Sequence, residues 1–245
     1  MKAVLLGVPA SHPSLAGELM LERKGIEFER YDLVPALHRL ILKRVFPAGT
    51  VPAVVIDGQR FQGTRTISRA LDALVPEPPL FPEDPERRAE VERAELWGDL
   101  VFQSAARRLA WAALKRDHST IRSFLEGSNL PLPIGLAVAT AAPVVWLAAR
   151  GNRAGDRSAQ QDLAALPGML DQVDELIERG VIGGAEPNAA DYQLATSVRL
   201  LMGLDDLREE IEGRPSGRLA LRLVPDFPGQ VPPVFPPGWI ARSVR

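Results

Sequence analysis

The sequence predicts an α/β domain followed by an all-α domain. Three observations lead to this prediction: short β-branched runs alternate with helical patterns over the first 75 residues, a proline-rich segment follows, and every later pattern is helical. We expect the α/β domain over residues 1–75, a linker over 76–85, the helical domain over 86–224, and a proline-rich extended tail over 225–245.

Within the first domain we expect the order βαβαββα. In chain order the elements are a strand at 2–6, a helix at 14–24 that ends at Gly25, a strand at 28–33, a helix at 35–45, a hairpin around Asp57-Gly58, and a helix at 64–74. The first two strands should be parallel because a helix connects them. Together these elements predict a small α/β sandwich.

The second domain shows long amphipathic patterns. Residues 86–115, 163–178 and 188–204 each place apolar residues on one helical face. Residues 130–149 carry no charge, and we interpret them as a buried helix, with a membrane contact as the alternative. The six prolines of residues 225–239 predict an extended tail over the surface.

Composition excludes several classes of site. The formal net charge of −2 offers no basic surface for nucleic acid or an anionic membrane, so we expect neither partner. The chain has no cysteine, which excludes disulfides and thiolate metal sites, and its three histidines lie far apart, so we expect no metal. The apolar N-terminus is short and broken by Gly7 and Pro9, so we interpret it as a strand and expect a cytoplasmic protein.

A proline opens the first strand of the predicted hairpin. Pro52 cannot donate a ladder hydrogen bond, and a cis Val51-Pro52 bond would free the backbone of Val51 for pairing with an extended ligand. This part of the sequence therefore predicts a binding site for a peptide-like molecule.

With Val51-Pro52-Ala53, the proline-rich linker and the helical second half, residues 2–205 resemble the glutathione S-transferase superfamily, and specifically its serine-type classes. The resemblance implies a thioredoxin-like first domain, glutathione as co-substrate, and a homodimer. It also implies that Val51 and Pro52 contact the cysteinyl backbone of glutathione. Residues 187–192 resemble the family's helix-start motif, in which Asn188 and Asp191 form a structural capping box.

The segment Ser11-His12-Pro13-Ser14 resembles the thiol-activating segment of those classes. A free thiol titrates near ~8.5, and a hydroxyl that donates to sulfur beside a helix N-terminus favours the nucleophilic thiolate. Ser11 is our candidate catalytic residue. Ser14 is an alternative, and either serine could instead be an ordinary N-cap. His12 could donate to the ligand or be a solvent-facing loop residue. We expect a packing role for Tyr31.

The sequence departs from the family at the start of the third helix. There the family usually has an acidic or amide residue followed by serine, whereas this chain has Gly63-Thr64-Arg65. Thr64 and the free N–H groups can hold a carboxylate, but no acid is present for an ammonium group. Arg65 could bind an anion or form a surface ion pair.

We favour an enzyme that conjugates a bound thiol, glutathione by resemblance, to a hydrophobic small-molecule electrophile, as in detoxification. Trp97, Val101 and Trp111 could line the acceptor site or pack in the core. The alternative function is a non-catalytic binding or scaffolding protein of the same fold with a degenerate thiol site.

Overall fold

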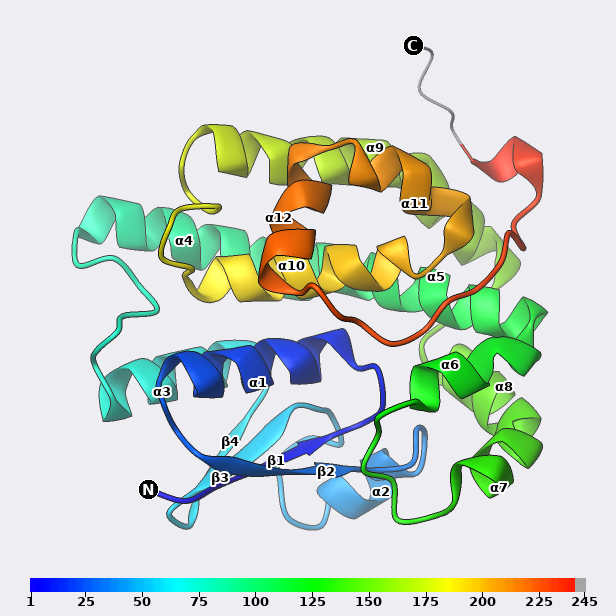
Figure 1. The fold of residues 1–245 in the computed structure, drawn as a ribbon, viewed down its shortest axis with the longest axis horizontal. Coiled ribbons are helices and arrows are strands. Elements are labelled where there is room, and N and C mark those ends of the chain that lie inside the picture. The colour runs from blue at the N-terminus through cyan, green and yellow to red at the C-terminus, as the bar shows by residue number, and fades with distance from the viewer. Residues whose placement is uncertain (241–245) are drawn as a thin grey trace.

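A computed structural model describes residues 1–240 of the chain, with a four-stranded sheet on one side and a stack of helices on the other (Figure 1). The strands are β1 (Ala3–Gly7), β2 (Phe28–Asp32), β3 (Ala53–Ile56) and β4 (Gln59–Gln62), in the order β2-β1-β3-β4. β1 pairs parallel to β2 and antiparallel to β3, and β3 turns back into β4. The predicted α/β fold class and hairpin are confirmed.

Helices cover both faces of this sheet. α1 (His12–Arg23) and α3 (Thr64–Leu74) lie between the sheet and the helical layer, whereas α2 (His38–Leu42) lies on the opposite face (Figure 1). Alternate residues of β3 point to opposite faces. Val54 therefore joins the main core beneath α1 and α3, and Ala53 packs with Leu42 of α2.

The second helix is much shorter than the sequence pattern suggests. Only His38–Leu42 is helical, although we expected residues 35–45. Ala36 has a left-handed backbone (φ 67°), which delays the helix start. Leu40 and Ile41 are exposed, so the apolar pattern there does not reflect a continuous buried face.

The remaining helices form the second layer. They are α4 (Pro85–Trp97), the π-helical turn η1 (Gly98–Phe102), α5 (Gln103–Arg116), η2 (His118–Thr120), α6 (Ile121–Leu125), α7 (Ile134–Ala139), α8 (Ala141–Gly151), α9 (Asp156–Glu178), α10 (Ala189–Met202), α11 (Asp205–Glu212), α12 (Pro215–Leu223) and η3 (Pro237–Trp239). The all-α character of this half is confirmed. The domain boundaries at residues 75 and 86 remain a proposal.

α10 is the central helix of this half, and almost all of its residues are buried. It starts with the expected capping box. Asn188 Oδ1 accepts hydrogen bonds from the N–H groups of Ala190 and Asp191, and Asp191 Oδ2 accepts from the N–H of Asn188. α10 packs against α1, α4, α5 and α12, so it joins the helices of the second half to the sheet domain.

The uncharged stretch 130–149 is not one buried helix. It contains α7 and most of α8, which Thr140 separates, and α7 buries no residue. Leu136, Trp146 and Leu147 are exposed. The buried-helix interpretation is therefore wrong for half of this segment. Within residues 1–240, no helix is long and apolar enough to cross a membrane.

The proline-rich tail is anchored rather than loosely extended. Val231 is fully buried and pairs with Leu204 in an isolated bridge, and Phe235 is buried as well. The tail runs along the helical layer to η3 (Figure 1). Residues 241–245 of the predicted tail lie outside the described residues.

Candidate functional site

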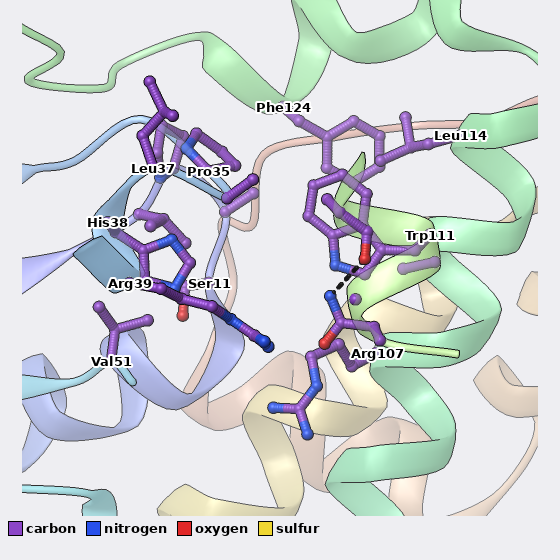
Figure 2. Close-up of a pocket in the computed structure, with 18 of the residues that line it drawn as sticks. Ser11, Pro35, Leu37, His38, Arg39, Val51, Arg107, Trp111, Leu114 and Phe124 are labelled. Atoms are coloured by element: carbon purple, nitrogen blue, oxygen red, sulfur yellow. Dashed lines mark hydrogen bonds between the residues drawn. The ribbon is translucent and has the colours of Figure 1, made fainter. Parts of the chain in front are cut away.

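A cavity of about 530 Å³ lies between the sheet domain and the helical layer. One side consists of the loop after β1, α2 with its flanks, and the segment before β3. The other side consists of α5, α6 and α8. Figure 2 shows Ser11, His38 and Val51 on the first side, opposite Trp111 and Arg107.

Ser11 lies at the cavity wall and caps α1. Its Oγ accepts hydrogen bonds from Ser14 N (3.2 Å) and from Ser14 Oγ (2.8 Å). With both of these bonds accepted, the Ser11 hydroxyl proton is available to a ligand. Ser11 therefore combines the N-cap role with a hydroxyl donor at the positive end of α1.

Ser14 and His12 are both buried, but they are not equivalent. Ser14 is fully buried behind Ser11 and does not line the cavity, which leaves Ser11 as the serine that a ligand can reach. His12 lines the cavity but is only 3% exposed, so its interpretation as a solvent-facing loop residue is wrong. It is the first residue of α1, and its ring contacts the backbone of Gln103 at the start of α5.

The imidazole of His12 is held neutral. Burial lowers its pKa well below the usual value, and the charge of Arg107 lowers it further, against a hydrogen bond with the backbone of Gln103. Its Nε2 is buried and has no hydrogen-bond partner in the described part of the chain. His12 can therefore offer a ring nitrogen to a ligand without carrying a proton charge near neutral pH.

Val51 lies beside Ser11 at the start of β3. The Val51-Pro52 peptide bond is cis, and among residues 1–240 the backbone N–H and C=O of Val51 have no hydrogen-bond partner. Pro52 O accepts a hydrogen bond from Gly63 N (2.9 Å), which joins the two predicted binding segments. The exposed backbone of Val51 is thus available for pairing with an extended ligand.

Gly63 and Thr64 lie next to the cavity but do not line it. Gly63 caps α3 with a left-handed backbone (φ 83°), and a Cβ there would meet open space. Thr64 is the first residue of α3 and is buried. This site therefore offers helix N–H groups but no acidic side chain of its own.

Arg65 does not face the cavity either. Its Nε lies 3.8 Å from Glu95 Oε2, so Arg65 takes the ion-pair role among our two alternatives. Glu95 is buried, also pairs with Arg69, and accepts a hydrogen bond from Ser68 Oγ (2.7 Å). Burial raises the pKa of Glu95 against these favourable contacts.

Four basic residues of the cavity were absent from our sequence-based predictions: His38, Arg39, Lys43 and Arg107. Three of them belong to α2 or follow it directly, and Arg107 comes from α5. Burial, with the charge of Arg39, lowers the pKa of His38 to about 4. The sequence signal for the three residues of α2 and its flank is a cluster of basic residues after Pro35, whereas no local pattern distinguishes Arg107.

The wall opposite Ser11 is apolar. Trp111 lines it together with Leu114 and Phe124 (Figure 2), which is the first of the two positions, cavity wall or core, that the sequence left open for Trp111. Trp97 and Val101 do not line the cavity: Trp97 stacks on Phe102 with the ring centroids 5.5 Å apart, and Val101 is 42% exposed. Tyr31 is also exposed and does not pack in the core.

Comparison with known proteins agrees with this geometry. Residues 5–79 match the family described as glutathione S-transferase, N-terminal domain. Across 93% of this chain and 96% of the other, the fold resembles a glutathione S-transferase from Sinorhizobium meliloti 1021, with a TM-score of 0.61 and 19% identity. Residues 5–79 therefore match the glutathione S-transferase N-terminal domain, and the chain as a whole has the glutathione S-transferase fold.

Two further similarities are to a curated protein and to a solved structure. The chain is 33% identical over 78 residues to a probable maleylacetoacetate isomerase of Caenorhabditis elegans. That match spans 32% of this chain and only 36% of the curated relative. A glutathione transferase homologue from Sulfitobacter, solved with bound glutathione, shares the fold at 16% identity and a TM-score of 0.56, over 89% of this chain and 95% of the other.

The described residues offer no set of ligands for a metal ion at this site. Residues 1–240 contain no group of three histidine, aspartate or glutamate side chains that could hold a metal ion. The cavity instead brings together a hydroxyl donor, an unpaired backbone edge, neutral imidazoles and basic side chains. These groups can donate hydrogen bonds to an anionic ligand and pair with an extended backbone.

Proposed function

We propose that this chain is a glutathione S-transferase-like enzyme of the serine type, which conjugates glutathione to a small electrophile bound in the cavity. The observation that carries the proposal is the position of Ser11. Its hydroxyl reaches the cavity at the N-terminus of α1, beside the unpaired backbone of Val51.

The proposed chemistry needs only an ionised thiol. The cysteinyl backbone of glutathione would pair with Val51, which brings its sulfur toward Ser11. The Ser11 hydroxyl and the α1 N-terminus both stabilise negative charge on that sulfur, and the thiol proton passes to solvent. The thiolate then attacks the electrophilic carbon, and the leaving group departs with its bonding electron pair.

The two ends of glutathione would meet different groups. Its glycyl carboxylate suits the basic side chains of α2 and its flank, Arg39 and Lys43. Its γ-glutamyl carboxylate suits the free N–H groups at Thr64. For the ammonium group, the candidate acid is Asp99 of η1, which interacts electrostatically with Arg65 and Arg107. Pro52, Gly63 and Ser14 do not line the cavity, and we propose that they position the residues that contact glutathione.

Assembly and location belong to the same proposal. We propose a homodimer, and the exposed apolar side chains Leu96, Leu100 and Val101 on consecutive turns of α4 and η1 support it. We also propose a cytoplasmic location and a small-molecule partner. Sedimentation equilibrium measures the association state directly.

The test of the function is retention on immobilised glutathione, followed by conjugation of chlorodinitrobenzene at millimolar thiol. We expect retention that free glutathione reverses, together with formation of the thioether. If the protein neither binds nor conjugates glutathione, the alternative gains: a non-catalytic binding protein of this fold. The missing acid at Gly63 is the observation that favours that alternative.

A further inference from the structure

The cavity carries positive charge only. Among the residues that line it, Arg39, Lys43 and Arg107 are basic, and none is an aspartate or glutamate. The two cavity histidines add no charge near neutral pH because burial lowers the pKa of each. This contrasts with the whole chain, whose formal net charge is −2.

Neither arginine forms a direct ion pair in the described part of the chain, although Asp99 interacts electrostatically with Arg107 from outside the cavity lining. Within residues 1–240, no ion pair of 4 Å or less involves Arg39 or Arg107, whereas Arg108, next in the chain, binds Asp162 through two hydrogen bonds of 2.6 and 2.7 Å. Among the described residues, the Arg107 guanidinium donates one hydrogen bond, a long one of 3.4 Å from Nη2 to Ser104 Oγ. Its donors are thus largely unsatisfied by protein.

The two guanidiniums lie close enough to repel each other. Figure 2 shows Arg39 and Arg107 extending toward the middle of the cavity from opposite sides. Burial lowers the pKa of Arg107, and the positive charge of Arg39 lowers it further. Arg39 Nη1 would lie 3.8 Å from a Cβ at Gly151, so this side chain spans the cavity to the end of α8. A cavity that holds two like charges together favours an anionic occupant.

Only one of the two arginines is needed for the thiol. Arg39 belongs to α2, on the same side as Val51, and suits the carboxylate of glutathione. Arg107 belongs to α5, one helical turn before Trp111, and stands beside the apolar wall that Trp111, Leu114 and Phe124 form. An occupant of that wall therefore meets a flat apolar surface and an unpaired guanidinium at once.

We propose that the electrophilic co-substrate is an aromatic carboxylate, whose ring lies against Trp111 and whose carboxylate binds Arg107. This inference rests on the proposed function and names its substrate class. A planar guanidinium binds a carboxylate through two parallel hydrogen bonds, and an aromatic ring packs well on indole. Arg107 is then a specificity-determining residue for the acceptor.

A matched pair of substrates tests the proposal. Chlorodinitrobenzoate and its methyl ester differ in charge, so kcat/KM for each is measured with glutathione, and the ratio of acid to ester is compared among variants. For Arg107→Gln we expect this ratio to fall by about ten-fold to a hundred-fold, since a hydrogen bond to a charged group contributes that much. Arg107→Lys keeps the charge and should retain part of the ratio.

Arg44→Gln is the control, because Arg44 is exposed and lies just outside the cavity lining. Its ratio should equal that of the wild type. If Arg107→Gln leaves the acid-to-ester ratio of kcat/KM unchanged, the proposal is overturned. An equal loss of kcat/KM for acid and ester is one such result, and it would assign Arg107 to binding of the thiol.

A binding measurement separates this inference from the proposed function. Calorimetry with dinitrobenzoate, which has no leaving group, and with its methyl ester needs no thiol chemistry. Preferential binding of the acid that Arg107→Gln abolishes supports the inference even if glutathione fails to bind. Equal binding of acid and ester, or binding of neither, overturns it, while conjugation of the ester can still show that the proposed function holds.

Discussion

Ser11 combines a structural role with a proposed chemical role in one hydroxyl group. As the N-cap of α1 it accepts the Ser14 N–H, and as a cavity residue it has a proton to donate. Ser11→Ala should therefore have two separable effects. The free energy of unfolding should fall by about 1 kcal/mol because the cap is lost.

The conjugation rate should fall much further than that loss of stability suggests. A hydrogen bond to a charged group contributes about 1.5–3 kcal/mol, so kcat/KM should drop by about ten-fold to a hundred-fold. Ser11→Thr keeps both the cap and the hydroxyl, and should stay close to the wild type in stability. A Ser11→Ala variant with unchanged kcat/KM would leave Ser11 a cap only.

His38 gives the protein a defined pH response. Burial lowers its folded pKa to about 4 from the ordinary value of 6.5. Between these values the unfolded chain binds a proton that the folded chain does not, so the contribution of His38 to stability is present above pH 6.5 and is lost as the pH falls toward 4. Burial and the charge of Arg39 both disfavour the charged imidazole, and together they outweigh a hydrogen bond with the backbone of Val34 that favours it.

The measurement is the free energy of unfolding in urea for the wild type and for His38→Gln, over pH 7 to about 4. The wild type should lose more stability than His38→Gln across this window. Parallel curves for the two proteins would contradict the assignment, because every other titrating group is common to both.

The sequence located part of the site and missed the rest for a physical reason. Ser11 and Val51 follow local rules, an N-cap position and a residue before proline, so their place could be predicted from their neighbours. Arg39 and Arg107 are far apart in the chain, and only the tertiary fold, which places α2 and α5 on opposite sides of one cavity, brings them together. Arg65 likewise pairs with Glu95, which is 30 residues away in the sequence, so its neighbours in the chain do not indicate this contact.

At the scale of elements, the π-helical turn η1 explains how one long pattern became two helices. We expected one helix over 86–115, and the chain instead has α4, η1 and α5 in succession. Gly98 opens η1 where α10 packs closely: a Cβ there would lie 3.0 Å from Gln193 Cγ and from Leu194 Cδ2. The close approach, which the helical period cannot show, depends on the absence of a side chain.

Gly98→Ala should therefore destabilise the protein, by about 1–3 kcal/mol, because the added methyl group overpacks this contact. Gly168→Ala is the matched control, since Gly168 is also helical but has nothing within 4 Å of an added Cβ. That change should stabilise by up to about 1 kcal/mol. Both values come from urea unfolding. Equal effects of the two substitutions would show that helix propensity, not packing, governs Gly98.

Elements with strong local signals matched the structure closely. α3 spans the expected residues 64–74, and the Asp57-Gly58 turn joins β3 to β4. The failures were α2 and residues 130–149, where apolar residues line a cavity rim or remain exposed. Apolar residues at helical spacing indicate that one face of a helix is covered. The spacing does not show whether the protein core or a bound ligand covers that face.

At the scale of the whole molecule, the two layers meet at the cavity. The sheet side contributes Ser11, Val51 and Arg39, and the helical side contributes Arg107 and Trp111. A thiol bound on one side and an acceptor on the other would approach each other there, with water excluded by the apolar wall. The proposed function thus depends on both halves of the chain, which is why neither half alone indicated the acceptor.

We propose that the cavity binds glutathione as a thiolate, which Ser11 stabilises. The most direct measurement is the ultraviolet absorbance of the thiolate, titrated against pH with glutathione bound to the wild type and to Ser11→Ala. We expect the bound thiol in the wild type to titrate at least about one unit below its free value of ~8.5, and to return toward that value in Ser11→Ala. A bound thiol with an unshifted pKa in the wild type, or no binding at millimolar glutathione, would contradict the account.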